Sequence, residues 1–172
     1  MEQKSNGQLV EFANYLEQAR RTAERPAHWP WQAIDAARLR FPHGERGTVA
    51  LVSGDRDGSG EVAPGLSLAV QTVLPDSDTS AHCHSFWHLY WVASGSGLLD
   101  LADAPRRVLA SGDVIYVPPW CMHAFLNPDG AAPLVMFALQ NLPQLAALGA
   151  LMRETNDGAR VSVHAAAQTG AT

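Results

Sequence analysis

Residues 82–97, HCHSFWHLYWVASGSG, decide how the rest of this sequence is interpreted. A β-strand alternates its side chains with a period of two. On that period, one face of the stretch carries His82, His84, Phe86, His88, Tyr90 and Val92. Imidazole is a side chain suited to Fe, Zn, Ni and Cu. We therefore predict a metal site inside a β-structure, with His123 from a later turn-rich segment as a further candidate ligand.

Length and composition favour one globular domain. The chain has 172 residues, of which 47% are hydrophobic and 17% are charged. These values are ordinary for a globular protein with a sizeable core. The net charge of −5 argues against a nucleic-acid surface, which needs clustered Lys and Arg. Cys83 and Cys121 do not form a disulfide framework, and Cys83 should point away from the histidine face.

No targeting or membrane segment is expected. Residues 1–8 are polar and lack the apolar core of a secretory signal. No apolar run approaches the roughly 18 residues of a membrane span. We expect a soluble, cytoplasmic protein.

The sequence divides into four parts. Residues 1–45 read as an N-terminal helix over 8–24 and an arm containing Trp29 and Trp31, with a helical turn over 33–39. Residues 46–141 read as short strands separated by turn signals every 8 to 12 residues or so, which is typical of a sandwich or barrel. Apolar residues at helical spacing predict a C-terminal helix over 142–152, within a part assigned to 142–155. Residues 156–172 read as a flexible tail.

Two spaced motifs carry a family resemblance. The first is His82-x-His84-x3-His88-x6-Gly95, which resembles the cupin motif H-x-H-x3-E-x6-G with His88 in place of the glutamate. The second is Gly112-x5-Pro118-x-Trp120-x2-His123-x3-Asn127, which resembles G-x5-P-x-G-x2-H-x3-N with Trp120 in place of a glycine. The resemblance implies an all-β fold, the cupin double-stranded β-helix or jelly-roll barrel, with N-terminal and C-terminal helices around it.

A closer resemblance is to the gentisate and 1-hydroxy-2-naphthoate (salicylate-type) dioxygenase branch of cupins. It rests on LAVQTVLP at 68–75, PPW at 118–120 followed by His123, and LPQLAALG at 142–149. The sequence departs from that branch in three ways. Those enzymes usually contain two cupin domains, carry H-R-H where Cys83 stands here, and often have a second histidine where Phe125 stands.

The resemblance assigns His82, His84 and His123 as metal ligands. His88 has three open interpretations: a fourth ligand, a base or orienting group beside the ligands, or a packed side chain. Other candidates in the pocket are Tyr90 and Tyr116 as catalytic donors and Gln71, Trp120 and Gln140 as substrate contacts. For the tyrosines and glutamines, the alternative is an ordinary side chain of the barrel, whereas Trp120 is predicted to be a pocket wall beside the metal.

The all-imidazole ligand set predicts the kind of substrate. Neutral imidazoles leave the charge of a divalent ion uncompensated, so the site should attract an anionic, bidentate ligand. Fe(II) is the expected metal, and Zn(II), Ni(II) and Mn(II) are the alternatives.

The sequence therefore predicts an Fe(II)-dependent dioxygenase that uses O2 on a small anionic substrate, an aromatic hydroxy acid or an enolate. The alternatives are another metal-dependent cupin enzyme (a lyase, an isomerase or an oxidative step in small-molecule biosynthesis) and a non-catalytic ligand-binding or sensor barrel. The N-terminal helix and the tryptophan arm favour a homodimer. No nucleic acid or membrane partner is expected.

Overall fold

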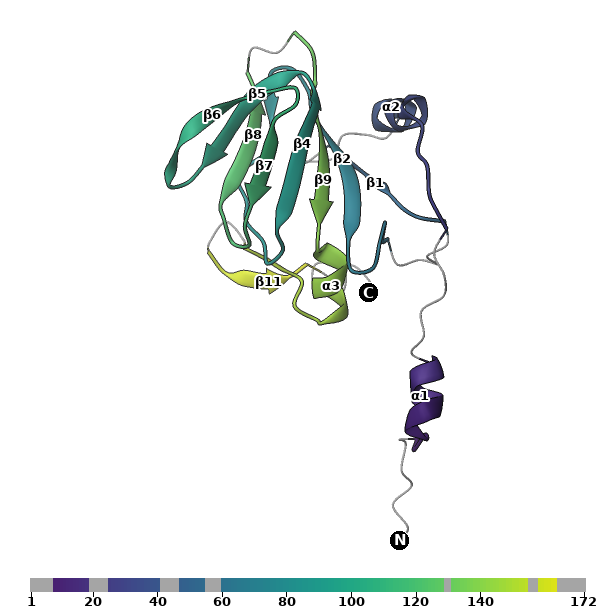
Figure 1. The fold of residues 1–172 in the computed structure, drawn as a ribbon. Helices are drawn as coiled ribbons and strands as arrows, with labels where there is room; N and C mark the ends of the chain where they lie inside the picture. The colour runs from purple at the N-terminus through teal and green to yellow at the C-terminus, as the bar shows by residue number, and fades with distance from the viewer. Residues whose placement is uncertain are drawn as a thin grey trace, which may run out of the picture.

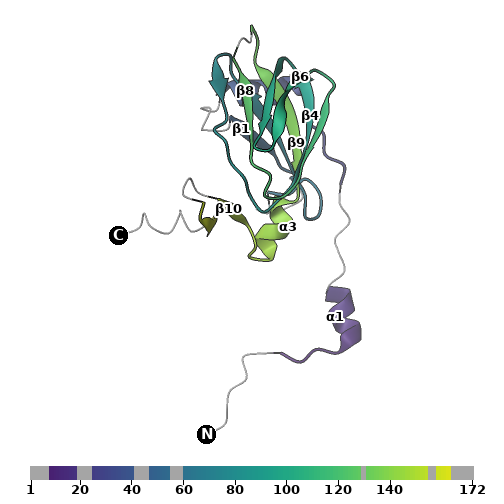
Figure 2. The same ribbon diagram turned by 90° about the vertical axis from the view of Figure 1, so that its left-hand side faces the viewer.

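Two antiparallel sheets face each other and form the barrel (Figures 1 and 2). The computed structural model describes residues 8–18, 25–40, 47–54, 60–128, 131–154 and 158–163. One sheet has the strand order β1-β2-β9-β4-β7 and the other β3-β8-β5-β6. The strands are β1 (Thr48–Leu51), β2 (Ser67–Val73), β3 (Ser77–Asp78), β4 (His88–Ser94), β5 (Ser96–Leu101), β6 (Ala104–Ala110), β7 (Val114–Val117), β8 (His123–Asn127) and β9 (Leu134–Gln140). The predicted all-β jelly-roll fold is confirmed.

The main core lies between the two sheets. It is built from buried side chains of β2 and of β4 to β9, among them Val73, Tyr90, Leu99, Phe125 and Met136. A smaller apolar cluster lies on the outer face of the five-stranded sheet, where helix α2 (Trp31–Arg40) supplies Ile34 against Val70 and Val135. Both faces of β2 are consequently covered, which explains why nearly all of its residues are buried.

Two motif positions have structural roles. Gly95 has φ +78°, and a Cβ placed on it would lie 2.2 Å from the Pro133 carbonyl oxygen, so only glycine fits. Asn127 is buried and donates its side-chain N–H groups to the carbonyl oxygens of Val73 and Ala132, at 3.1 and 3.0 Å. These contacts connect the ends of β2 and β8 and account for the motif glycine and asparagine by packing alone.

The N-terminal part differs from the expectation. Helix α1 (Phe12–Gln18) is shorter than the predicted helix over 8–24: residues 8–11 precede it without helical structure, and 19–24 lie outside the described residues. Its apolar side chains Phe12 and Leu16 are exposed, and the helix stands away from the barrel (Figure 1). The expected turn over 33–39 is a full helix, α2, because the Pro30 carbonyl starts it by accepting from the N–H groups of Ala33 and Ile34.

The C-terminal part is also different from the prediction. Helix α3 (Leu142–Ala147) ends before residue 152, because Gly149 has φ +65° and turns the chain. The chain then forms a hairpin of β10 (Met152–Glu154) and β11 (Arg160–Ser162). Residues 160–162 are therefore a strand rather than a tail, and 164–172 lie outside the described residues. None of the described helices is long and apolar enough to cross a membrane.

Candidate metal centre

The period of the histidine stretch suggested one continuous strand, but the structure divides it. β4 begins only at His88, after a bend at Ser85 and Phe86. His82 and His84 lie before the bend in isolated β-bridges, His82 with His123 and His84 with Arg153. His82 and His123 exchange both backbone hydrogen bonds, at 3.1 and 3.0 Å. This pairing joins the two sequence motifs directly.

Three imidazoles converge at this end of the barrel. One ring nitrogen from each of His82, His84 and His123 lies within 4.8 Å of the other two. The ring centroids are 4.4 Å apart for His82 and His123, 5.3 Å for His84 and His123, and 5.7 Å for His82 and His84. These are the three residues that the resemblance assigned to the metal.

The same nitrogen of each ring is anchored to the backbone. Nδ1 lies 2.8 Å from a carbonyl oxygen in all three rings, that of Ser80 for His82, Phe86 for His84 and Cys121 for His123. A carbonyl oxygen can only accept, so Nδ1 carries the proton and Nε2 presents its lone pair. Anchoring of this kind fixes both tautomer and ring orientation of a metal-binding histidine.

His84 is held neutral by its surroundings. It is 2% exposed, and the Phe86 ring stacks on it with centroids 3.7 Å apart. Burial, followed by electrostatic repulsion from His88 and His123, lowers the pKa of His84 from 6.5 to about 2. Its buried Nε2 atom makes no hydrogen bond with any residue that the structure describes. A neutral, buried lone pair aimed at two other imidazoles fits a bound transition metal.

His88 lies beside this group but is held differently. It is the first residue of β4 and is 7% exposed, with its ring centroid 4.6 Å from that of His84. Its Nε2, not its Nδ1, is anchored, at 2.8 Å from the side-chain oxygen of Gln140. The group of three histidines does not include it.

The inner face below the site is layered by strand register. Ser67, Gln140 and His88 are paired across β2, β9 and β4 and form the row nearest the histidines. The next inward-facing row is Ala69, Ala138 and Tyr90, followed by Gln71, Met136 and Val92. Tyr90, Gln71 and Gln140 thus lie on the inner face, and their proposed contacts with substrate remain predictions.

Tyr116 lies on the wrong face for the predicted catalytic role. It pairs with Leu89, one position away from the inward-facing pair of His88 and Val117. Because neighbouring residues of a strand point to opposite faces, its side chain is outside the barrel, where it is 59% exposed. The prediction of Tyr116 as a pocket donor is wrong.

Trp120 is hydrogen-bonded to His84 through the backbone. Its N–H donates to the His84 carbonyl at 2.8 Å, and its φ of +61° is the left-handed conformation that explains the glycine of the motif. The ring lies under the Arg160 guanidinium, 4.0 Å from carbon to centroid. A role of Trp120 as a pocket wall therefore remains a prediction.

The sequence did not predict the position of Arg153, which follows the helix predicted over 142–152. In the structure, β10 places it opposite His84. The available signal in the sequence was Gly149. A glycine often ends a helix, and the segment that follows it has the length of a short strand.

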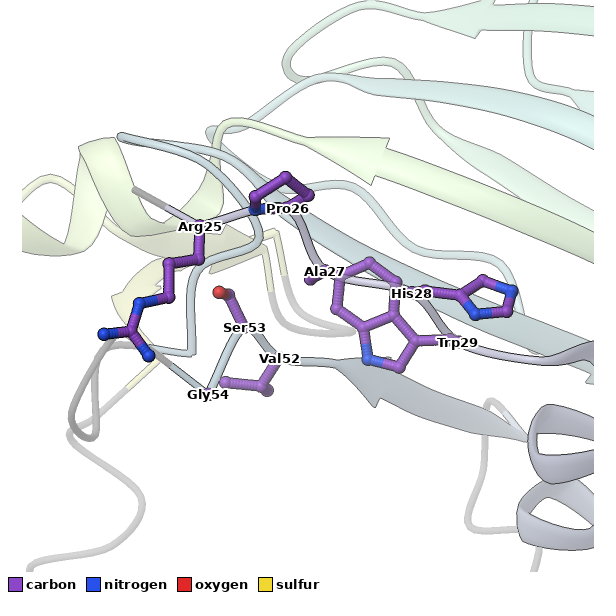
Figure 3. Close-up of a pocket in the computed structure, with 8 residues that line it drawn as sticks. All are labelled: Arg25, Pro26, Ala27, His28, Trp29, Val52, Ser53 and Gly54. Atoms are coloured by element: carbon purple, nitrogen blue, oxygen red, sulfur yellow. The ribbon is translucent and has the colours of Figure 1, made fainter. Parts of the chain in front are cut away.

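A pocket of about 330 Å³ lies elsewhere, on the N-terminal arm (Figure 3). Residues 25–29 form one side of it and Val52, Ser53 and Gly54 the other. None of the four histidines at the barrel end lines it. His28 there is exposed, as expected for a residue outside the metal site.

The jelly-roll barrel and the three convergent imidazoles are the features of a metal-binding barrel protein. Residues 69–139 match the family described as Cupin domain. This confirms the recognition made from the two motifs.

The relatives in sequence are dioxygenases. The chain is 28% identical over 138 residues to 1-hydroxy-2-naphthoate 1,2-dioxygenase of Nocardioides sp. (strain KP7), a match that covers 78% of this chain and 35% of that protein. It is 35% identical over 91 residues to 5-aminosalicylate 1,2-dioxygenase of Comamonas sp., covering 53% and 24%. It is 28% identical over 101 residues to gentisate 1,2 dioxygenase 1 of Aquipseudomonas alcaligenes, covering 59% and 29%. The chain thus spans about a third or less of the length of each.

The fold is shared with a solved enzyme. A mutant of salicylate 1,2-dioxygenase from Pseudoaminobacter salicylatoxidans, in complex with gentisate, superposes with a TM-score of 0.74 at 18% identity. The superposition covers 86% of this chain and 44% of that one. At this identity, the likeness concerns the barrel fold.

Proposed function

We propose that the chain is an Fe(II)-dependent dioxygenase domain acting on a small anionic substrate, an aromatic hydroxy acid or an enolate that binds through two oxygens. The observation that carries the proposal is the group of three histidines anchored through Nδ1. The named activities of the sequence relatives support the reaction class. Zn(II), Ni(II) and Mn(II) are the alternative metals for these nitrogens.

The ligand set supports an anionic substrate. His82, His84 and His123 would hold the ion through neutral nitrogens, and no carboxylate of the described residues belongs to their group. The positive charge of the metal would therefore be balanced by the substrate. Bound iron would supply Lewis acidity and redox chemistry with O2.

His88 is proposed as the base that takes the substrate hydroxyl proton. Gln140 accepts the hydrogen bond from Nε2, which leaves Nδ1 as the basic atom of the ring. The ring is within 4.8 Å, centroid to centroid, of Tyr90, which lies one row deeper in the barrel. Tyr90 would bound the substrate on that side.

Oxygen consumption tests the proposal. Protein reconstituted with Fe(II) under anaerobic conditions is mixed with aerated salicylate, gentisate, hydroxynaphthoates and β-diketones in an oxygen electrode. We expect uptake with at least one aromatic hydroxy acid, no uptake by His123→Ala, and unchanged uptake by His28→Ala, a matched change at an exposed histidine. No uptake with any compound, together with tight Zn(II) binding, would contradict the oxygenase and favour a non-redox cupin enzyme or a ligand-binding barrel.

We also propose a cytoplasmic homodimer. Leu89, Trp91, Val114 and Tyr116 form an exposed apolar patch on the outer face of β4 and β7, because Leu89 pairs with Tyr116 and Trp91 with Val114. A contiguous patch of this kind is typical of an interface, here with a second copy.

The dimer is tested by light scattering coupled to size exclusion. We expect Val114→Glu to give monomers, while Val108→Glu, a matched change at an exposed valine of β6 in the other sheet, stays dimeric. A monomeric wild-type protein would exclude the dimer.

A further inference from the structure

Arg153 lies directly opposite the metal-ligand candidate His84. The bridge between them is flanked by two backbone hydrogen bonds, Ser85 N–H to the Met152 oxygen at 2.9 Å and Glu154 N–H to the Cys83 oxygen at 3.1 Å. This is the non-hydrogen-bonded pair of an antiparallel ladder, in which opposite side chains stand closest and on one face. The Arg153 side chain therefore leaves the hairpin on the face that carries the His84 imidazole.

The charges of the hairpin are divided between its two faces. Glu154 pairs in register with Arg160, and their side chains are 3.6 Å apart. Glu154 also raises the pKa of Cys83, after the larger effect of burial, so it lies on the side of that thiol. Arg160 covers Trp120. Glu154 is thus occupied on the face opposite to Arg153.

The Arg153 guanidinium has an unused donor. Its Nε is buried and makes no hydrogen bond with any residue in the described parts of the chain. A buried charged donor without an acceptor is costly, so such a group calls for a ligand. Planar carboxylates match the guanidinium geometry through two parallel N–H···O bonds.

We propose that Arg153 is a specificity residue that binds the carboxylate of an aromatic hydroxy acid seated at the three histidines. This inference rests on the proposed function in that the metal binds the hydroxyl side of the same substrate. Because Arg153 starts from the His84 face of the hairpin, its guanidinium would add a second attraction for an anion bound at the histidines. Enolates without a carboxylate would lack the two parallel N–H···O bonds to Arg153.

Binding to Zn(II)-loaded protein tests the site without turnover. Salicylate and its neutral amide, salicylamide, differ at the group that Arg153 would bind, and calorimetry measures both. We expect Arg153→Gln to weaken salicylate binding by about tenfold or more and to leave salicylamide binding and zinc content unchanged. Arg160→Gln removes the same charge from the other face and should bind salicylate as the wild type does. Arg153→Lys, which keeps the charge without the bidentate geometry, should lose several-fold.

The outcomes separate this inference from the proposed function. Wild-type affinity for salicylate in both Arg153 variants would overturn the carboxylate site, whatever the oxygen electrode reads. Equal loss in Arg160→Gln would overturn it too, because the effect would then come from net charge. An Arg153-dependent preference for salicylate without oxygen uptake supports the site and contradicts the oxygenase.

Discussion

Four histidines meet at one end of the barrel, but two kinds of anchor hold them. His82, His84 and His123 donate from Nδ1 to backbone carbonyls, whereas His88 donates from Nε2 to the side chain of Gln140. Backbone anchors present Nε2 of three rings to a common point. The side-chain anchor presents Nδ1 of the fourth ring instead. The comparison teaches that the anchored nitrogen, rather than the position in the motif, distinguishes a ligand candidate from a base candidate.

The strongest way to break this comparison is to remove one backbone-anchored ring. His123→Ala takes away one of three ligands from a buried site, so we expect loss of stoichiometric metal, measured by elemental analysis after dialysis. His88→Ala is the matched control and should keep its metal. Metal retained by His123→Ala would contradict its assignment as a ligand. Metal lost from His88→Ala would contradict the assignment of His88 as a base outside the ligand set.

For His88, we expect the opposite result: metal binding is kept and turnover is lost. His88→Asn should retain iron but lose turnover by about 10²- to 10⁴-fold, the range of general acid–base catalysis. The loss should be in kcat, because the metal would still bind substrate. A loss confined to KM would mean that His88 positions the substrate and does not move a proton.

Acid should destabilise the apoprotein through His84. Its pKa is about 2 in the folded state against 6.5 as the ordinary value, so only the unfolded chain takes up this proton between those limits. Stability is therefore highest above pH 6.5 and falls on acidification, by about 1.4 kcal/mol per pH unit from this group. Urea unfolding with EDTA at pH 5, 6 and 7 measures the slope, which should be shallower in His84→Phe. An equal slope in both proteins would contradict a neutral His84.

The smallest expected effect comes from the side-chain anchor. Gln140→Leu removes the acceptor for His88 Nε2 and should lower kcat by about tenfold while metal content stays the same. Gln32→Leu, at an exposed position of α2, is the matched control. A shifted pH–rate profile in Gln140→Leu would support tautomer control, and an unchanged kcat would show that the anchor is dispensable.

The ligand candidates could be predicted because their alternation along the chain puts them on one face whether or not the strand is continuous. His82 and His84 keep the facing that a strand would give them, although a bend at Ser85 and Phe86 interrupts the strand. Strands such as β7 and β9 fit the predicted pattern of short apolar runs between turn signals. Local patterning is sufficient for such elements.

Register and long-range pairing could not be predicted from the sequence. The run Val114–Val117 is apolar at every position, so its alternation does not say which face Tyr116 occupies, and pairing with β4 decides it. Arg153 reaches His84 through a bridge between distant segments. The apolar spacing after residue 142 also fits a helix until Gly149 turns the chain.

The hairpin that pairs with the His82–Phe86 segment has a consequence for biosynthesis. The Ser85 hydroxyl donates to the Ala150 carbonyl at 2.8 Å and accepts from the Met152 N–H at 2.9 Å, contacts that span 65 and 67 residues. On a ribosome, the first two candidate ligands emerge long before these partners are made. Such non-local contacts must wait until the intervening chain has been made. The segment 82–86 should therefore take its final position only after the hairpin has been synthesised, later than the candidate ligands His82, His84 and His123 themselves.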